Sequence, residues 1–370
     1  MNTFERTRSS ICTYFSLLFF LWVGPSSSLE HTQTISYSHL ILEEHNSAHI
    51  LEVDPKQMTI IAAKAKGPIL ETVPTIAKRY HAVAAVNGGF FQQHGDFADL
   101  PMGILKIDNA WCATPHKPRG AIGWSKDGNP LFDQVLTSVM GNAEGTFFPI
   151  NGINRIRKEN QIILYNSFFH KRTSTNMSGV EYLIKNRTVE AVSEGNSKIP
   201  EQGWILSVAT MKKPSITLKR GEEVAFNVNV IPQSKPAYTT SEMWNYASYI
   251  VGGCPILIRD SNIITDFSLE KTNDNFLYKP HARTAVGLLS NGHWIFVTID
   301  GSDSLILKNK GMTIPELANF MKSLGCVEAL NLDGGGSTTL FYRGSVVNHP
   351  CGEENDGTRK VSDAILLIPK

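Results

Sequence analysis

Residues 329–340 read Ala-Leu-Asn-Leu-Asp-Gly-Gly-Gly-Ser-Thr-Thr-Leu, and this stretch says most about the fold. A short apolar strand ends at Asp333, three glycines follow, and Ser337 opens a run of hydroxyl side chains. Successive glycines allow backbone N–H groups to converge on an oxyanion. The stretch is not a P-loop, because no lysine precedes the serine, and it lacks the second glycine of a nucleophile elbow. It therefore predicts a buried strand that ends in a Gly-rich turn, either purely structural or able to bind an anion.

Turn signals elsewhere predict antiparallel strand pairing. Residues 291–292 read Asn-Gly and separate the strand-like runs 284–289 and 293–299. Asn-Gly between such runs is a strong hairpin signal, because both central residues of the turn need a positive φ. Asp-Gly at residues 127–128 and Arg-Gly at residues 343–344 occupy similar positions between strand-like runs.

Two helices are predicted from their end signals. Thr313 is a suitable N-cap, and Glu316 stands where it closes a capping box. Apolar residues then recur at helical spacing until Gly325, which is a good stop signal. The second helix is expected to begin after Thr72 and to end near Tyr80.

The composition fits one large folded domain. Hydrophobic residues make up 42% of the 370 residues, charged residues 19%, and the formal net charge is +1. Such a chain can bury a sizeable core, and its charge argues against a nucleic-acid-binding protein. We assign residues 40–370 to a single α+β domain, which is glycine-rich, mixed, and mostly antiparallel β with a few helices.

Residues 1–28 have the order of a secretory signal peptide. Arg6 and Arg8 precede an apolar run over residues 11–23, and small residues follow up to Ser28. The apolar run is shorter than the ~20 residues that a membrane span needs, although an uncleaved anchor is the alternative. We expect a mature protein that is secreted or periplasmic and has no membrane span.

Four cysteines remain after removal of the signal peptide: Cys112, Cys254, Cys326 and Cys351. An even number in an exported chain permits disulfides, and the sequence does not decide their pairing. The absence of a CxxC pair argues against a zinc site built from cysteines. Cys254 is a conceivable nucleophile, but a buried or paired cysteine is the more usual case.

Three further strands begin or end at a polar side chain. Asn87 and two glycines follow the apolar run 82–86, Arg283 begins a strand, and Asp300 ends one. Glycine permits close approach of the backbone to a ligand, a guanidinium suits phosphate, and a carboxylate serves as an acid, a base or a ligand. The structural alternatives are a capped turn for Asn87 or Asp300 and a surface salt bridge for Arg283. The predicted hairpin places Arg283 and Asp300 at one end.

The predicted site combines these features. The catalytic residues are Asp333, Asp300 and Arg283, and the substrate-binding residues are Asn87, Gly88, Gly89, Gly334, Gly335, Gly336 and Ser337. No metal and no cofactor is predicted.

In this order, the motifs resemble the phosphodiester glycosidase family. The resemblance, from about residue 40 to the carboxyl end, is carried by Asn87-Gly88-Gly89-Phe90-Phe91, Gly252-Gly253-Cys254-Pro255, Arg283-Thr284-Ala285-Val286-Gly287, Asp300-Gly301, Gly311-Met312-Thr313, Glu316-Leu317-Ala318, Asn331-Leu332-Asp333-Gly334-Gly335-Gly336-Ser337-Thr338 and Val361-Ser362-Asp363-Ala364-Ile365-Leu366. The family has a compact Glu-Arg pair near the end, whereas here Glu353 and Glu354 precede Arg359 by several residues.

The resemblance implies a mixed α/β domain with a glycine-rich cleft and an exported hydrolase. That hydrolase cleaves a sugar, GlcNAc-like, from a sugar-1-phosphodiester. Arg283 would bind the phosphodiester, the glycine amides would hold phosphate oxygens, and Asp333 or Asp300 would activate water or stabilise the oxocarbenium-like centre. Asn87 and Ser337 would orient the substrate.

Two alternatives remain open. The first is a metal-dependent phosphodiesterase with Asp300, Asp333 and His281 as ligands. The second is a non-catalytic polysaccharide-binding or envelope-assembly protein on the same scaffold.

Overall fold

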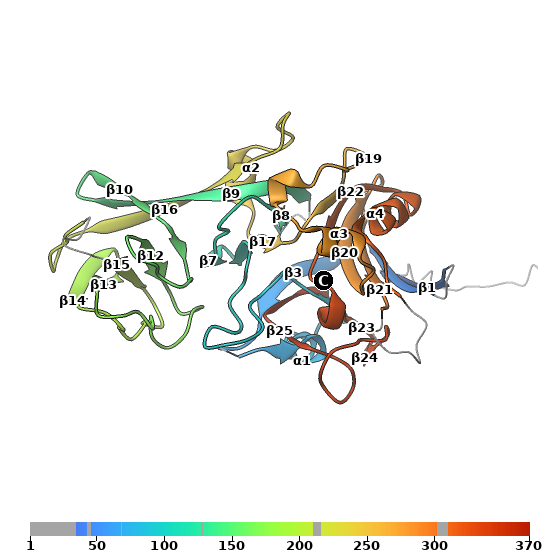
Figure 1. Ribbon diagram of the computed structural model, residues 1–370, viewed down its shortest axis with the longest axis horizontal. Coiled ribbons are helices and arrows are strands. Elements are labelled where there is room, and N and C mark those ends of the chain that lie inside the picture. The colour runs from blue at the N-terminus through green and yellow to red at the C-terminus, as the bar shows by residue number, and fades with distance from the viewer. Residues whose placement is uncertain (1–34, 43–45, 68, 127–128, 210–215, 302–309) are drawn as a thin grey trace, which may run out of the picture. The chain divides into compact units, whose positions relative to one another are not determined.

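Antiparallel pairing dominates the chain. The computed structural model describes residues 35–42, 46–67, 69–126, 129–209, 216–301 and 310–370, so the predicted signal peptide lies outside the described residues. The described residues belong to one unit, Thr34–Lys370 (Figure 1). Among their strand pairs, β11–β12 alone is parallel. The prediction of a mostly antiparallel β fold is therefore confirmed.

The first sheet carries the predicted hairpin. Its seven strands, in spatial order, are β1 (Ile35–Ile41), β2 (Ser47–Val53), β21 (Trp294–Ile299), β20 (Arg283–Leu289), β22 (Cys326–Asn331), β18 (Ile256–Arg259) and β19 (Asn262–Ile263). Arg283 is opposite Ile299 in the β20–β21 pair, which confirms the hairpin. The turn is one residue longer than the predicted two-residue turn, because Leu289 faces His293 and only Gly292 of the Asn-Gly pair has a positive φ. Strand β20 lies between β21 and β22, so the ends of β21 and β22 that precede Asp300 and Asp333 lie at the same edge.

A second sheet brings distant parts of the sequence together. Its strands, in order, are β24 (Ser345–Val346), β23 (Leu340–Tyr342), β5 (Ala84–Asn87), β26 (Asp363–Pro369) and β3 (Met58–Lys64). Pairing of β23 with β24 confirms the hairpin predicted at residues 343–344. A small separate sheet joins β4 (Glu71–Thr72) to β25 (Lys360–Val361).

The middle of the chain forms two more sheets. One contains β10 (Thr146–Ile150), β9 (Pro130–Ala143), β8 (Arg119–Trp124), β17 (Tyr249–Gly252), β6 (Leu105–Ile107) and β7 (Ala110–Ala113), with β16 (Val224–Pro232) also on β9. The other contains β11 (Gly152–Ile153), β12 (Ile162–Tyr165), β15 (Trp204–Ala209), β13 (Gly179–Lys185) and β14 (Thr188–Ser193). In Figure 1, β9 and β16 run as long strands from the neighbourhood of β8 to β10. Pairing of β8 with β9 agrees with the third predicted hairpin, whose turn residues 127–128 lie outside the described residues.

Helices are few and short in the described residues. They are α1 (Val73–Arg79), α2 (Ser241–Tyr246), α3 (Asp274–Tyr278) and α4 (Ile314–Ser323). The predicted capping box between Thr313 and Glu316 is present, and Gly325 has a φ of +89° just beyond the helix. Helix α1 begins and ends where the sequence predicted. In this part of the chain, no helix has the length and apolar character that crossing a membrane requires.

The strands that lead to the predicted site are covered on both faces. Val286 and Leu330 pack into one apolar cluster, while Ala285 and Ala329 pack into another beneath α4. Strands buried on both faces read as nearly continuous apolar runs, which is the pattern seen for β20, β21 and β22. The polar residues that flank these strands therefore lie deep in the protein.

The expected disulfides are not present. Cys112, Cys254, Cys326 and Cys351 form no disulfide with one another. Cys112 and Cys326 are buried in two different apolar clusters, so their thiols contribute to packing. Burial raises the pKa of the Cys254 thiol, which disfavours the thiolate that a nucleophile requires.

Candidate active site

Asn87 joins the end of β5 to the loop after β22. Its Nδ2 donates to the carbonyl oxygen of Asp333 at 2.8 Å, and its Oδ1 accepts from the Thr284 hydroxyl at 2.7 Å. The Asp333 amide donates in turn to the Gly88 carbonyl at 3.2 Å. With 1% of its surface exposed, Asn87 holds two loops from opposite ends of the sequence in register. Its predicted direct contact with substrate stays a prediction.

Asp333 is a buried carboxylate with one oxygen still available. Its Oδ1 accepts from the Gly334 amide at 2.9 Å, whereas its Oδ2 has no hydrogen-bond partner among the described residues. Burial raises the pKa of Asp333 to about 6, against the opposing effects of the nearby Ser337 hydroxyl and of the Gly334 amide. The group can therefore exchange a proton near neutral pH, which a general acid or base must do.

Asp363 is a second buried carboxylate, and it is not among the site residues predicted from the sequence. It is the first residue of β26, and its Oδ2 accepts from the Gly89 amide at 3.0 Å. Burial, with a smaller contribution from the negative charge of Asp333, raises the pKa of Asp363 to about 7 against the opposing effects of the Gly89 amide and Lys64. The sequence did contain a signal for Asp363, because this residue begins an apolar strand just as Arg283 does.

Gly88 and Gly89 are required by these contacts. A Cβ atom at Gly88 would lie 1.9 Å from Asp363 Oδ2, and one at Gly89 would lie 2.6 Å from the carbonyl oxygen of Gly252. The two glycines thus permit a close approach between the backbone and two groups of the protein itself, the Asp363 carboxylate and the Gly252 carbonyl. The predicted approach of this backbone to a ligand stays a prediction.

Two adjoining cavities lie beside this carboxylate. A cavity of about 80 Å³ is lined by Asp363, Gly89 and Arg119, among others. A second, of about 240 Å³, is also lined by Arg119 and carries Lys117 and Lys271. Burial and the nearby charge of Arg119 lower the pKa of Lys117. The larger cavity is therefore a positively charged extension of the smaller one.

Arg359 is a further charged group near Asp333. Its Nε lies 2.9 and 3.1 Å from the two carboxylate oxygens of Glu353, so the Glu-Arg pair forms despite the longer spacing. A Cβ at Gly336 would come within 2.5 Å of Arg359 Nη2, which places the guanidinium against the triple-glycine turn. The positive charge of Arg359 opposes the rise in the pKa of Asp333.

Arg283 lies at the predicted end of β20, but its side chain is directed to backbone groups. Its Nε donates to the carbonyl of Met312 at 2.8 Å, and its Nη2 donates to the carbonyls of Phe276 and Lys279. The residue is 2% exposed, and burial lowers the pKa of Arg283 to about 10. These contacts tie α3 to the sheet. The predicted role of Arg283 as a phosphate ligand stays a prediction that they do not favour.

Asp300 lies at the same edge, in a different environment. Its Oδ2 is 3.2 Å from His49 Nε2 and 3.0 Å from His349 Nδ1. Burial alone would raise the pKa of Asp300, but hydrogen bonds from these two histidines outweigh it and lower the pKa. Asp333 is therefore near enough to Asp363 for its charge to raise the pKa of that carboxyl, whereas Asp300 is hydrogen-bonded to two imidazoles. The metal-dependent alternative grouped Asp300 with Asp333 and His281, whereas the possible metal-binding group among the described residues is His49, Asp300 and His349.

The triple-glycine turn uses two of its three amides within the protein, and its predicted contact with substrate stays a prediction. The amides of Gly334 and Gly335 already donate to Asp333 Oδ1 and to the Ala282 carbonyl. Buried polar atoms without a hydrogen-bond partner in the described structure instead include Asn331 Oδ1, Asp333 Oδ2, Ser337 Oγ, Thr338 Oγ1 and Thr339 Oγ1. Such atoms are rare in native proteins and mark positions where water or a ligand binds.

Comparison with known proteins places these motifs in a family. Residues 178–368, more than half of the chain, match the family model described as phosphodiester glycosidase. This chain belongs to the phosphodiester glycosidase family. The matched range includes Asp300, Asp333, Arg359 and Asp363, while Asn87 precedes it.

Individual relatives are distant. The N-acetylglucosamine-1-phosphodiester alpha-N-acetylglucosaminidase of Mus musculus is 32% identical over 131 residues, which cover 32% of this chain and 25% of the mouse protein. A hypothetical protein from Synechocystis has a TM-score of 0.76 at 22% identity, over 92% of this chain and 63% of that one. The zebrafish N-acetylglucosamine-1-phosphodiester alpha-N-acetylglucosaminidase catalytic domain has a TM-score of 0.52 at 18% identity, over 92% of this chain and 86% of that one. The structures support the fold, and the match spans about a quarter of the mouse protein.

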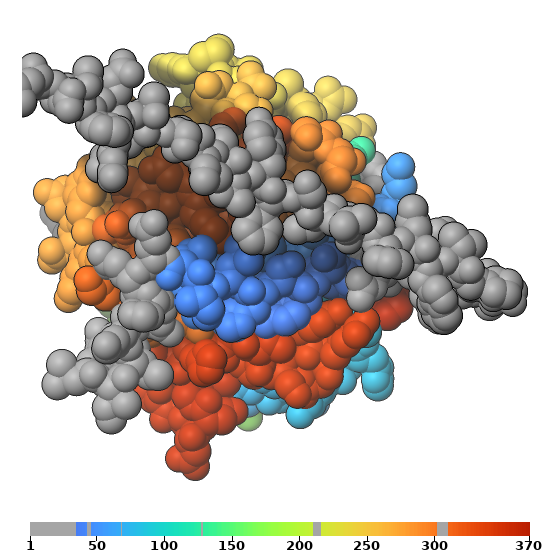
Figure 2. Space-filling model, turned by 90° about the vertical axis from the view of Figure 1, so that its right-hand side faces the viewer, coloured from blue at the N-terminus to red at the C-terminus, as the bar shows by residue number. Residues whose placement is uncertain are grey.

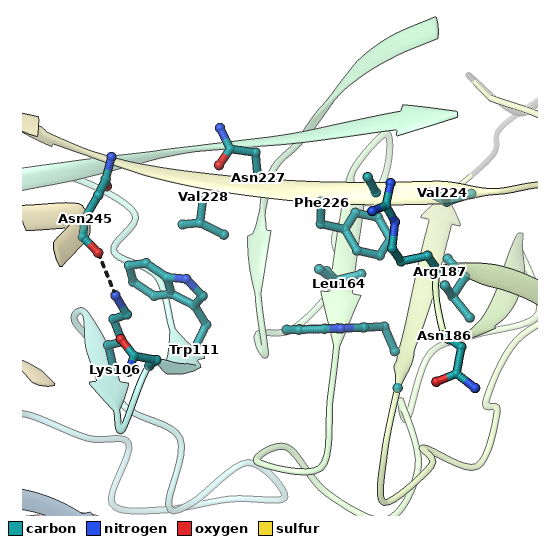
Figure 3. A pocket seen from close by; sticks show the side chains of 15 residues that line it. Lys106, Trp111, Leu164, Asn186, Arg187, Val224, Phe226, Asn227, Val228 and Asn245 are labelled. Carbon is teal, nitrogen blue, oxygen red and sulfur yellow. Dashed lines mark hydrogen bonds between the residues drawn. The ribbon is translucent and has the colours of Figure 1, made fainter. Parts of the chain in front are cut away.

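A larger cavity lies elsewhere, beside β16 (Figure 3). It has a volume of about 680 Å³, and its lining includes Trp111, Trp204 and Phe226. Figure 3 shows Asn227 and Asn245 along the same wall, and a hydrogen bond joins Lys106 to the backbone carbonyl of Asn245. Neither Asp333 nor Asp363 lines this cavity.

Proposed function

We propose that this phosphodiester glycosidase family member hydrolyses a sugar-1-phosphodiester, releasing a GlcNAc-like sugar and leaving a phosphomonoester. The observation that carries the proposal is the pair of buried carboxylates, Asp333 and Asp363, whose pKa values are both raised toward neutrality. The name of the mouse relative supports the sugar and the phosphodiester as substrate class.

The two carboxylates are assigned different protonation states. Burial raises the pKa of Asp333 to about 6 and that of Asp363 to about 7, so both groups can exchange a proton near neutral pH. The charge of ionised Asp333 adds to the rise in the pKa of Asp363. We therefore assign the ionised form to Asp333 and the protonated form to Asp363, the arrangement typical of acid–base catalysis.

The chemistry follows from this assignment. Water attacks the anomeric carbon, the bond from that carbon to the phosphate oxygen breaks, and its electron pair stays on the phosphate. Asp333 accepts the proton of the attacking water or stabilises the oxocarbenium-like centre. A phosphomonoester leaves more easily than an alcohol, so Asp363 needs to supply little protonation.

We assign the phosphate to the basic groups beside the carboxylates. Arg119 lines both cavities, and Lys117 and Lys271 line the larger one. Arg359 lies against the triple-glycine turn. A guanidinium offers a planar fork for phosphate oxygens. Arg119 and Arg359, rather than Arg283, would therefore bind the phosphate, and Arg283 would hold α3 against the sheet through its backbone contacts.

The proposal is tested by hydrolysis of a GlcNAc-1-phosphodiester by the purified chain. Asp333→Asn and Asp363→Asn should each lower kcat/KM by about 10³-fold or more while circular dichroism and Tm show a folded protein. Asp96→Asn, at an exposed aspartate, is the matched control and should retain turnover. Near-wild-type turnover by Asp333→Asn would overturn the assignment.

A second candidate, carbohydrate binding, is favoured by the cavity in Figure 3. Aromatic rings beside amide and guanidinium groups suit a sugar, which offers apolar faces and hydroxyl edges. Calorimetry with oligosaccharides, using Trp204→Ala beside Asp333→Asn, separates the candidates. Binding that is lost only in Trp204→Ala, without turnover by the wild type, would support a non-catalytic polysaccharide-binding protein.

We also propose that the protein is exported, because residues 1–28 have basic, apolar and small residues in the succession of a signal peptide. Amino-terminal sequencing of protein recovered outside the cytoplasm of an expression host tests it. Cleavage near Ser28 is expected, and an intact amino terminus would contradict it.

A further inference from the structure

Three side chains from separate parts of the sequence meet at Asp300. His49 lies on β2, Asp300 follows β21, and His349 follows β24. Figure 2 shows the blue amino-terminal strands beside the red carboxyl-terminal segment, and the ring contact between His49 and His349 joins these two regions. This cluster is not used by the proposed reaction.

Both imidazoles are directed at one carboxylate oxygen. His49 Nε2 and His349 Nδ1 lie 3.2 and 3.0 Å from Asp300 Oδ2. One donor atom from each residue can be chosen so that all three lie within 4.8 Å of one another. A four-coordinate Zn²⁺ with bonds of ~2.1 Å holds its ligands about 3.4 Å apart, so small side-chain movements would admit the ion.

The surroundings orient the buried imidazole. Tyr37 Oη lies 2.9 Å from His49 Nδ1, the ring nitrogen that does not face Asp300. When His49 Nδ1 carries the proton and donates it to Tyr37, the lone pair of Nε2 points to the cluster. Metal-binding histidines are usually held this way by a hydrogen bond to their other nitrogen. The ring of His39 stacks on His49 with 4.3 Å between centroids, which fixes its plane.

Burial distinguishes the three donors. The His49 and Asp300 side chains are 2% and 1% exposed, whereas that of His349 is 65% exposed. An ion can therefore enter from the side of His349 and keep one position open to solvent. Two imidazoles and one carboxylate with an open position form a donor set that zinc and similar metals use.

We propose that His49, Asp300 and His349 bind one divalent transition-metal ion, Zn²⁺ by preference, at a site separate from Asp333 and Asp363. The ion would join β2, β21 and the segment after β24. Its protein ligands would be two neutral imidazoles and the Asp300 carboxylate.

The test is Zn²⁺ titration of the chelator-treated full chain against a fluorescent competitor. One ion per chain is expected, together with a rise in Tm. His349→Ala and Asp300→Asn should each weaken binding by at least 100-fold. Co²⁺ should give a visible spectrum that changes in both variants. His293→Ala, whose imidazole pairs with Glu52 outside the cluster, is the matched control and should bind as the wild type does.

His349 is exposed, so His349→Ala tests the site even if Asp300→Asn fails to fold. Absence of Zn²⁺ binding by the folded wild type would overturn the proposal. So would binding that is unchanged in His349→Ala, or that is lost instead in Cys351→Ser, because the ion would then lie elsewhere.

Discussion

Asp300 and Asp333 follow the same local pattern, and the fold gives them opposite environments. Asp300 comes directly after β21, and Asp333 comes shortly after β22. Each aspartate precedes a glycine, and the two buried strands flank β20. Asp300 meets two imidazoles, and its pKa is lowered. Asp333 is close to a second carboxylate, and burial raises its pKa. The comparison shows that the partners supplied by other strands decide what an aspartate at a strand end can do.

The largest effect on the surroundings of Asp333 is expected from Gly88→Ala. Its Cβ would lie 1.9 Å from Asp363 Oδ2, so the carboxylate must move away from Gly89. We expect kcat/KM to fall by about 10³-fold and Tm to fall as well. Gly103→Ala is a control for Tm alone: its Cβ would meet only an ordinary contact at 3.7 Å, but Gly103 also lines the smaller cavity. Full activity of Gly88→Ala would show that Asp363 need not be held in place.

Asp300→Asn tests the other half of the comparison. Because its pKa is lowered, ionised Asp300 stabilises the fold at neutral pH, and this contribution is lost as the pH falls through its folded-state pKa. Removing the charge from a buried pair should cost about 3 kcal/mol at pH 7, measured by urea unfolding. The deficit relative to the wild type should shrink on acidification. A deficit independent of pH would contradict the assigned charge state.

Asp363→Asn should change the free energy of unfolding in the opposite direction from Asp300→Asn. A carboxylate whose folded-state pKa is raised destabilises the fold as the pH rises from about 4 toward 7, because burial disfavours its charged form. Asparagine has no such charge, so the variant should be more stable than the wild type by about 1–3 kcal/mol at pH 8. The gain should vanish near pH 4. Urea unfolding at both pH values checks it, and equal destabilisation at both would refute it.

Gly336→Ala is expected to give the smallest effect. Its Cβ would approach Arg359 Nη2 to 2.5 Å, but a flexible side chain can shift. We expect a rise in KM of about 10-fold with a smaller change in kcat, because Arg359 is assigned to the phosphate. Steady-state kinetics on the diester check this. A fall in kcat with unchanged KM would instead place Arg359 at the reacting centre.

Local signals in the sequence were sufficient for much of the fold. The hairpin around residues 291–292 and the capping box at Thr313 depend on a few adjacent residues, and both were predicted correctly. The four cysteines illustrate the opposite case. Their even number says nothing about their positions, and the folded chain buries Cys112 and Cys326 in separate clusters.

The site was predicted only in part, because its contacts cross the sequence. Gly89 and Asp363 are separated by 274 positions, and no local pattern links them. Asp300 and His49 are separated by 251 positions, so their hydrogen bond could not be predicted from a local pattern either. For Arg283 the sequence placed the residue correctly at the start of β20. Only the structure shows that backbone carbonyls use its donors.

The position of β26 between β3 and β5 has a consequence for how the protein folds. Strands β3 and β5 are close in sequence but do not pair, since β26 lies between them. This sheet cannot form until β26 has been synthesised, almost three hundred residues after β3. Contacts of such long range in the sequence slow folding. Asp363 is the first residue of that strand. The carboxylate pair therefore assembles late, so a partly folded chain would lack the chemistry even where its hairpins have already formed.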